Sequence, residues 1–137
     1  MNTMNTKPIL SLSAAQAMIA AAVAEAEALG VPQVIAIVDD GARLKAMCRM
    51  DDAPLPSIEV AQDKAYTALL GVPSGDLFEM VQGDPALRAS MPGIARVTMI
   101  AGGVPIRIDG RLVGAIGVGG GTPEQDMQCA TAALNSV

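Results

Sequence analysis

The sequence predicts one α+β domain in which an antiparallel sheet is flanked by helices. The chain has 137 residues, which is long enough for one hydrophobic core but not for two. Short β-branched runs stand between longer helical segments, and neighbouring runs are joined by hairpin-length connections, as at Asp109-Gly110. We expect residues 10–137 to form this domain and residues 1–9 to form a disordered tail.

The first helix is expected over residues 13–29. Ser13 and Gln16 have the spacing of a capping box, in which each side chain satisfies a free backbone N–H of the first turn. Gly30 suits the left-handed position that follows many helices. Pro32 then prevents the helix from continuing, because proline has no N–H to donate.

Two strands and a second helix should follow. Residues 34–39 and 43–50 have strand character, and the turn-forming Asp39-Asp40-Gly41 between them predicts a hairpin. Ser57 is expected to begin a helix that runs to about Leu70 and ends before Gly71.

The second half is expected to hold two short helices, three strands and a last helix. Asp84-Pro85 should cap the second short helix, and Thr122 with Gln125 should form a capping box on the last one. The expected ranges are 74–82 and 84–90 for the short helices, 97–100, 104–108 and 111–118 for the strands, and 122 to the C-terminal end for the last helix.

Composition limits the partners of the chain. The net charge is −5 and the nine basic residues are dispersed, so we expect no nucleic-acid partner. No apolar run reaches the ~20 residues that cross a bilayer, and Gln16 interrupts the Ala-rich first helix, which argues against a signal peptide. We therefore expect a cytoplasmic protein with no membrane contact. Phe78 and Tyr66 are the only aromatic residues, and such a small-residue core buries little area, which predicts a homo-oligomer.

The absence of histidine excludes whole classes of site. Neither a Ser-His-Asp nor a Cys-His catalytic arrangement can be built from this chain. Cys48 and Cys129 have neither metal-ligand spacing nor the number needed for a disulfide framework, so we expect two small buried residues and no metal site.

Residues 101–126 contain eight glycines and lead from two strands into the last helix. Two interpretations are open for the loop before Thr122. The free N–H groups of a helix N-terminus can bind an anion, whereas a glycine turn can be capped by its own residues. Glu124 and Asp126 lie in the first turn and would repel an anion.

Lys64 and Tyr66 are the other residues whose type suggests chemistry. Lys64 falls near the buried stripe of the second helix, so it either pairs with a carboxylate, for which Asp39 is a candidate, or binds or activates a substrate. Tyr66 either packs with its hydroxyl at the surface or acts as a general acid or haem ligand.

Several segments together resemble the GlcG/HbpS-like family, which also occurs as the C-terminal domain of PduO-type proteins. The resemblance covers about residues 10–134. It implies a profilin-like fold with a five-stranded antiparallel sheet flanked by helices, assembly into homo-oligomers, and haem binding in some members. The matching segments are Asp39-Asp40-Gly41-Ala42-Arg43-Leu44, Arg49-Met50-Asp51-Asp52, Ser57, Ala61, Lys64-Ala65, Gly102-Gly103-Val104-Pro105-Ile106, Gly114-Ala115-Ile116-Gly117-Val118-Gly119-Gly120 and Gln125-Asp126.

From this resemblance we expect a small-ligand-binding protein that acts as an accessory in small-molecule catabolism. Its ligand would be haem, another tetrapyrrole or a small carboxylate metabolite. Without histidine, haem iron could be ligated only by Met, Cys, Tyr66 or a weaker oxygen donor. The candidate ligand-binding residues are Arg49, Asp51, Lys64, Gly102, Gly103, Pro105, Gly119, Gly120 and Thr122.

Two alternatives remain open, so the sequence does not decide whether the chain is an enzyme. The first is a cofactor-free isomerase, hydratase or lactone-opening enzyme, with Lys64 or Asp39 as the base and Tyr66 as the acid. The second is an oligomeric structural or chaperone-like accessory with no small ligand.

Overall fold

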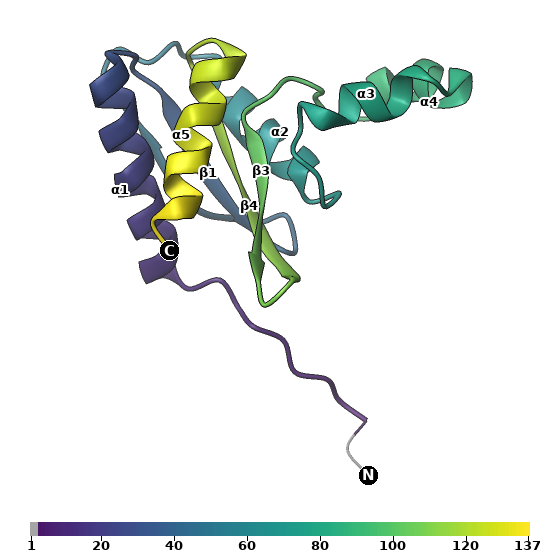
Figure 1. The fold of residues 1–137 in the computed structure, drawn as a ribbon, viewed down its shortest axis with the longest axis horizontal. Helices are drawn as coiled ribbons and strands as arrows, with labels where there is room; N and C mark the ends of the chain where they lie inside the picture. The colour runs from purple at the N-terminus through teal and green to yellow at the C-terminus, as the bar shows by residue number, and fades with distance from the viewer. Residues whose placement is uncertain (1–2) are drawn as a thin grey trace.

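The computed structural model describes residues 3–137, which form a four-stranded antiparallel sheet covered by helices on both faces (Figure 1). The strand order is β2-β1-β4-β3. The elements are α1 (Leu12–Leu29), β1 (Val34–Asp39), β2 (Leu44–Arg49), α2 (Ser57–Ala68), α3 (Asp76–Gln82), α4 (Pro85–Ser90), the 3-10 helix η1 (Met91–Gly93), β3 (Gly103–Ile108), β4 (Arg111–Gly119) and α5 (Pro123–Asn135).

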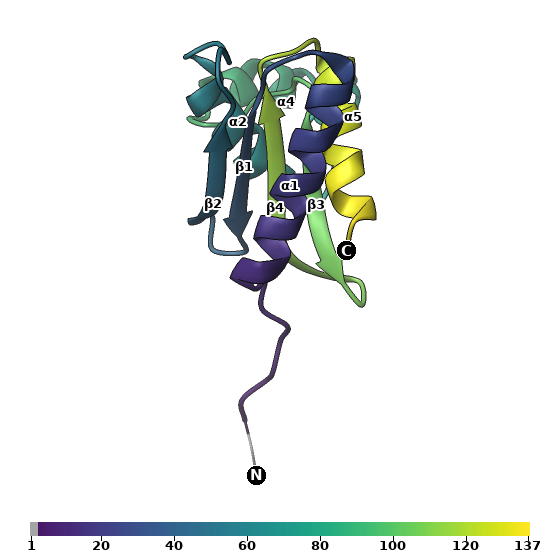
Figure 2. The same ribbon diagram turned by 90° about the vertical axis from the view of Figure 1, so that its left-hand side faces the viewer.

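Helices α1 and α5 lie side by side on one face of the sheet, and α2 covers the other (Figures 1 and 2). The main core lies between the sheet and the α1–α5 pair, where Ile35 and Ile37 of β1 meet Ile116 and Val118 of β4. Helix α1 is long and apolar enough to cross a bilayer, but here it packs on this face. Its buried residues are Ala15, Met18, Ala22 and Ala26.

Most of the predicted turns and caps are confirmed. Gly30 adopts a left-handed conformation (φ 70°) after α1, and Asp109 and Gly110 both have positive φ in the β3–β4 hairpin. Thr122 and Gln125 form the capping box of α5, and Asp84 caps α4. The cap of α1 differs, because Ser11 rather than Ser13 accepts a hydrogen bond from Ala14 N and starts the helix earlier.

The predicted strand over 97–100 is wrong, so the expected fifth strand is not found among residues 3–137. The segment instead lies along α2, where Thr98 N donates to Thr67 Oγ1 at 2.9 Å. Within the segment, Ile100 N donates to Thr98 Oγ1 at 3.4 Å. These side-chain acceptors take backbone donors that a strand partner would otherwise need to satisfy.

The N-terminal segment and the short helices extend from this body. Residues 3–9 contain no helix or strand, and Lys7 pairs with Asp40 at 2.6 Å; residues 1–2 of the predicted tail lie outside the described residues. Helices α3 and α4 pack against each other in an arm that projects away from the sheet (Figure 1). We use the name arm for residues 76–93.

Glycines allow α2 to lie directly on the backbone of β3 and β4. A Cβ atom at Gly117 would overlap the carbonyl oxygen of Ala61, and one at Gly103 would overlap that of Lys64. The sheet-facing residues of α2 are also small, with Ala61, Ala65 and Ala68 fully buried. The helix and the sheet therefore approach more closely than larger side chains would permit.

This close approach predicts that Gly117→Ala lowers the free energy of unfolding by about 3 kcal/mol, because the added methyl meets a helix backbone that cannot rotate away. Urea unfolding followed by far-UV circular dichroism measures it. Gly83→Ala is the matched control, since nothing lies within 4 Å of its Cβ position, and it should stay within about 0.5 kcal/mol of wild type. Equal urea midpoints for Gly117→Ala and wild type would contradict this packing.

Candidate functional site

Lys64 forms a buried ion pair with Asp126, which joins α2 to the first turn of α5. Lys64 Nζ donates to Asp126 Oδ2 at 2.6 Å and to the Val118 carbonyl at 3.0 Å, and both charged side chains are 2% exposed. Asp126 Oδ1 accepts a further hydrogen bond from Gly121 N at 2.9 Å. Most of the hydrogen-bonding capacity of the pair is thus used inside the protein.

The suggested pairing of Lys64 with Asp39 is therefore wrong. Asp39 Oδ1 accepts from Gly41 N and Arg43 N, which fixes the turn between β1 and β2. Asp39 pairs with Gly114 on β4, four residues before the Val118 carbonyl that Lys64 contacts. Those two positions lie roughly 13 Å apart at the rise of a strand.

The proposed acid–base residues are not brought together. Tyr66 follows Lys64 by two positions on α2, so their side chains leave the helix on nearly opposite sides. Lys64 points toward Asp126, Asp39 accepts hydrogen bonds within the β1–β2 turn, and Tyr66 lines a separate cleft. The geometry gives no support to a shared catalytic centre made from these three residues.

The predicted glycine turns are filled by the chain itself. A Cβ at Gly102 would lie 2.9 Å from Lys64 Nζ, and one at Gly120 would lie 2.9 Å from the Pro32 carbonyl. Gly119 lies against the first turn of α2, at Ser57 and Ala61. At the start of α5, Gly121 N donates to Asp126 Oδ1, and Thr122 N and Gln125 N donate to the two side chains of the capping box. Gly102 and Gly119 therefore make room for the ion pair and α2, whereas Gly120 makes room for the segment before β1.

Of the remaining predicted ligand-binding residues, Arg49, Asp51 and Pro105 lie apart from the ion pair, whereas Thr122 begins the helical turn that carries Asp126. In the sheet, Val34 of β1 pairs with Arg49 on one side and with Gly119 on the other, so one strand separates Arg49 from Gly119. Arg49 and Asp51 line a different, shallow pocket beside Glu27 of α1. Pro105 lies in the edge strand β3, as its missing N–H predicts. Thr122 caps α5.

An apolar cleft lies where the C-terminal end of α2 meets the end of the arm and the segment that follows it. We call it the Tyr66 cleft; its volume is ≈ 260 Å³. Thr67 Oγ1 holds its two walls together, since it donates to the Asp63 carbonyl at 2.8 Å and accepts from Thr98 N at 2.9 Å. The lining residues are Tyr66, Thr67, Leu69, Leu70, Met91, Ile94 and Val97.

Arg96 lies against this cleft in a strained conformation. Its φ is 69°, a left-handed value that costs a non-glycine residue on the order of 1 kcal/mol or more. Its guanidinium carbon lies 4.3 Å from the centroid of the Tyr66 ring, and its Nε lies 3.6 Å from Asp63 Oδ1. Within residues 3–137 no hydrogen bond reaches the Tyr66 hydroxyl. The face of the Tyr66 ring thus carries a positively charged group, while the hydroxyl makes no hydrogen bond within the described residues.

Sequence reasoning singled out Tyr66 but not the other wall of its cleft. Met91 was expected only to end the short helices, Ile94 and Arg96 fell between predicted elements, and no local pattern links the three residues to α2. The only signal was Tyr66 itself, as the single phenol in the chain.

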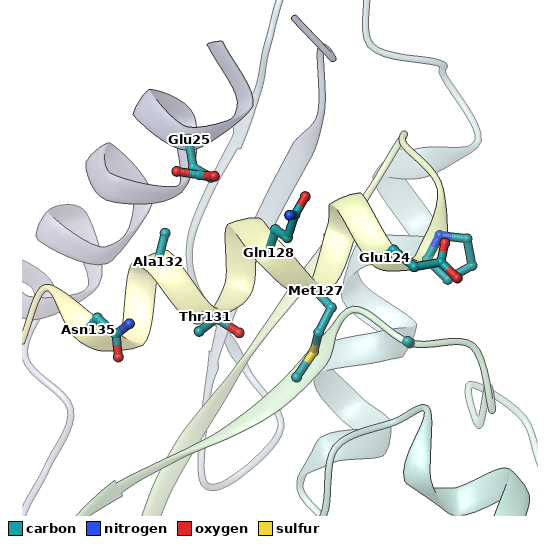
Figure 3. Close-up of a pocket in the computed structure, with 9 residues that line it drawn as sticks. Glu25, Glu124, Met127, Gln128, Thr131, Ala132 and Asn135 are labelled. Carbon is teal, nitrogen blue, oxygen red and sulfur yellow. The ribbon is translucent and has the colours of Figure 1, made fainter. Parts of the chain in front are cut away.

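Two larger clefts have acidic rims. The first, of ≈ 580 Å³, runs along α5, and Figure 3 shows Glu25 of α1 on one side of it; Glu124 adds a second carboxylate, and no basic residue lines it. The second, of ≈ 560 Å³, lies between β2 and α2 and contains Glu59 and Asp63 with Arg96. Neither rim suits a ligand with two carboxylates of its own.

Neither cysteine is suited to nucleophilic or metal chemistry. Burial raises the pKa of the Cys129 thiol to about 11, and the nearby carboxylates of Glu25 and Asp126 add to the effect. Burial also raises the pKa of Cys48. Both thiols are therefore protonated at neutral pH, and residues 3–137 contain no cluster of three metal-ligating side chains.

The ion pair predicts a large effect when only one partner is changed. Asp126→Asn should lower the free energy of unfolding by about 3–5 kcal/mol, because it leaves the Lys64 ammonium buried without a carboxylate. The double variant Lys64→Met/Asp126→Asn removes the charge and keeps an oxygen for Gly121 N, so it should be more stable than Asp126→Asn alone. Urea unfolding of the three proteins measures both effects. A single variant as stable as wild type would show that Lys64 does not depend on the carboxylate.

The chain is similar to several known proteins over nearly its whole length. It is 36% identical over 137 residues to an uncharacterized 15.0 kDa protein from the dhaT-dhaS intergenic region of Citrobacter freundii, covering 98% of this chain and 96% of that protein. It is 41% identical over 116 residues to the protein GlcG of Escherichia coli strain K12, covering 84% of each.

The fold is also similar to that of solved structures. The crystal structure of a PduOC–haem complex superposes with a TM-score of 0.89 at 35% sequence identity, covering 95% of this chain and 96% of that one. The family model described as haem degrading protein HbpS-like matches residues 10–135. The match spans the sheet and both helical layers, so the chain belongs to the HbpS-like family.

Proposed function

We propose that this chain binds haem or a related planar tetrapyrrole in the Tyr66 cleft and serves as an accessory protein in small-molecule catabolism. One observation carries the proposal: the cleft combines apolar walls with two side chains, Tyr66 and Met91, of types that ligate haem iron in proteins. The similarity to the haem-bound PduOC structure supports it.

The residues around the cleft fit such a ligand. The porphyrin ring needs apolar surface, which Leu69, Leu70 and Ile94 supply. Its carboxylates need cations, and Arg107 lies beside the cleft, where its Nη2 donates to the Gly71 carbonyl at 3.0 Å, directly after Leu70. Haem, when bound, supplies a redox-active iron; the residues of the chain hold it, orient it and exclude water from one edge.

The cleft is too small to enclose the whole ligand. Pockets that enclose a drug-sized molecule usually have volumes of about 300–1,000 Å³, so this one would receive one edge of the ring. Leu70 and Ile94 are 59% and 48% exposed and extend the apolar surface outward. We propose that a second copy of the chain covers this surface. Phe78, Met80 and Leu87 on the neighbouring arm are also exposed and add to the area available for assembly.

Titration of the purified protein with ferric haem tests this proposal. We expect a saturable shift of the Soret band with wild type, and at least tenfold weaker binding with Ile94→Glu, because a carboxylate would enter the apolar wall and repel the ligand's own carboxylates. Leu12→Glu is the matched control. It makes the same change at a residue of similar exposure (50%) at the start of α1, which packs on the other face of the sheet, and should bind like wild type.

Circular dichroism of each variant establishes that it is folded before titration. Wild-type protein that gives no saturable Soret change would rule out the proposed function. Equal loss of affinity in Ile94→Glu and Leu12→Glu would place the ligand elsewhere.

A further inference from the structure

We infer that the phenol oxygen of Tyr66 is the iron ligand when ferric haem binds this chain, and that Arg96 is the positioning residue that orients the Tyr66 ring. This inference rests on the proposed haem binding at the Tyr66 cleft. It goes beyond that proposal because it names the protein atom that ligates the iron.

The choice of Tyr66 begins with the donors that the chain contains. With no histidine, the side chains that commonly ligate haem iron are nine methionines, two cysteines and one tyrosine. Neither Cys48 nor Cys129 lines the cleft, and burial keeps both thiols protonated. In the cleft, Thr67 Oγ1 is already engaged with Asp63 and Thr98. Tyr66 and Met91 are therefore the two donors left at its walls.

The chemistry of ferric iron favours Tyr66 over Met91. A phenolate oxygen is a hard anionic donor and matches Fe(III), whereas a thioether sulfur is soft and neutral. The Tyr66 hydroxyl also has no hydrogen bond within the described residues that ligation would have to break. Ligation would replace the phenol O–H bond with an oxygen–iron bond, and the proton would leave to solvent together with the water or chloride that the iron had carried. The iron remains Fe(III), so no reductant or oxidant is needed.

Arg96 restrains the orientation of the Tyr66 ring and places a positive charge near it. Its guanidinium lies over the Tyr66 ring at 4.3 Å, which limits rotation of the ring and places a positive charge beside the phenolate that ligation creates. Asp63 holds the guanidinium from the other side at 3.6 Å. The left-handed backbone of Arg96 is consistent with a conformation maintained for this contact, because strained residues cluster at functional sites.

Spectroscopy of the ferric haem complex tests the assignment. Wild type should show the phenolate-to-iron charge-transfer absorption and the high-spin electron paramagnetic resonance signal of tyrosinate ligation. Tyr66→Phe keeps the ring and removes the oxygen, so it should lose both signatures and bind haem about tenfold more weakly, through the apolar walls alone. Met91→Leu is the matched control in the same cleft and should keep both signatures.

The role of Arg96 is tested in the same way. Arg96→Met should change the electron paramagnetic resonance signal of the complex, and Arg96→Lys, which keeps the positive charge, should restore part of the wild-type signal. A signal unchanged in Arg96→Met would remove Arg96 from the inference.

The outcomes separate this inference from the proposed function. If Tyr66→Phe binds haem with the wild-type spectrum, or if Met91→Leu abolishes the signatures, Tyr66 is not the ligand although haem binding stands. If wild type binds no haem, both proposals fail together.

Discussion

The close approach of α2 to the backbone of β3 and β4 determines most of the other features of this protein. Glycines at positions 103 and 117 let the carbonyls of Lys64 and Ala61 lie where side chains would otherwise stand. The space between helix and sheet is then filled by backbone and small residues, with Ala61 and Ala65 fully buried. No ligand can enter there, so the polar and aromatic residues of α2 that could serve a ligand must lie on its outer side. Tyr66 is such a residue.

The buried ion pair depends on the same close approach. A Cβ at Gly102 would lie 2.6 Å from the Val118 carbonyl oxygen and 2.9 Å from Lys64 Nζ, so the glycine leaves room for the hydrogen bond between them. The Lys64 ammonium reaches both the Val118 carbonyl and Asp126, and so ties α2 to the end of β4 and the start of α5. An apolar pair of similar volume would often be as stable. The charged pair differs because Lys64 can make both of its hydrogen bonds only when α2, β4 and α5 are arranged as they are here. The pair therefore fixes the position of α5 relative to α2.

The sequence predicted the features that depend on neighbouring residues. The Asp109-Gly110 turn and the capping box of Thr122 and Gln125 follow from residues at most three positions apart, and both are confirmed. The strand expected over 97–100 failed because Thr67, from another element, supplies an acceptor for Thr98 N. Local β propensity does not anticipate such a bond.

The partner of Lys64 was missed for the same physical reason. Asp126 is 62 residues away in the chain, and no pattern of spacing connects the two. The lysine was correctly placed near the buried stripe of α2, because that depends on helical periodicity alone. The second wall of the Tyr66 cleft is also a long-range feature, so one tyrosine was identifiable from the sequence but not the cavity that it lines.

The two walls of the Tyr66 cleft are supported unequally, and this bears on how a ligand would be held. The α2 wall is fixed by its contact with the sheet, whereas the opposite wall is held mainly by Thr67 and by Arg96 on Tyr66. Segments with few buried contacts open at lower free energy than a core does. Met91 belongs to the arm, in η1, so this wall is joined to the arm through the backbone. A contact that immobilised the arm, such as one with a second copy of the chain, would therefore also order the wall against which the ligand packs.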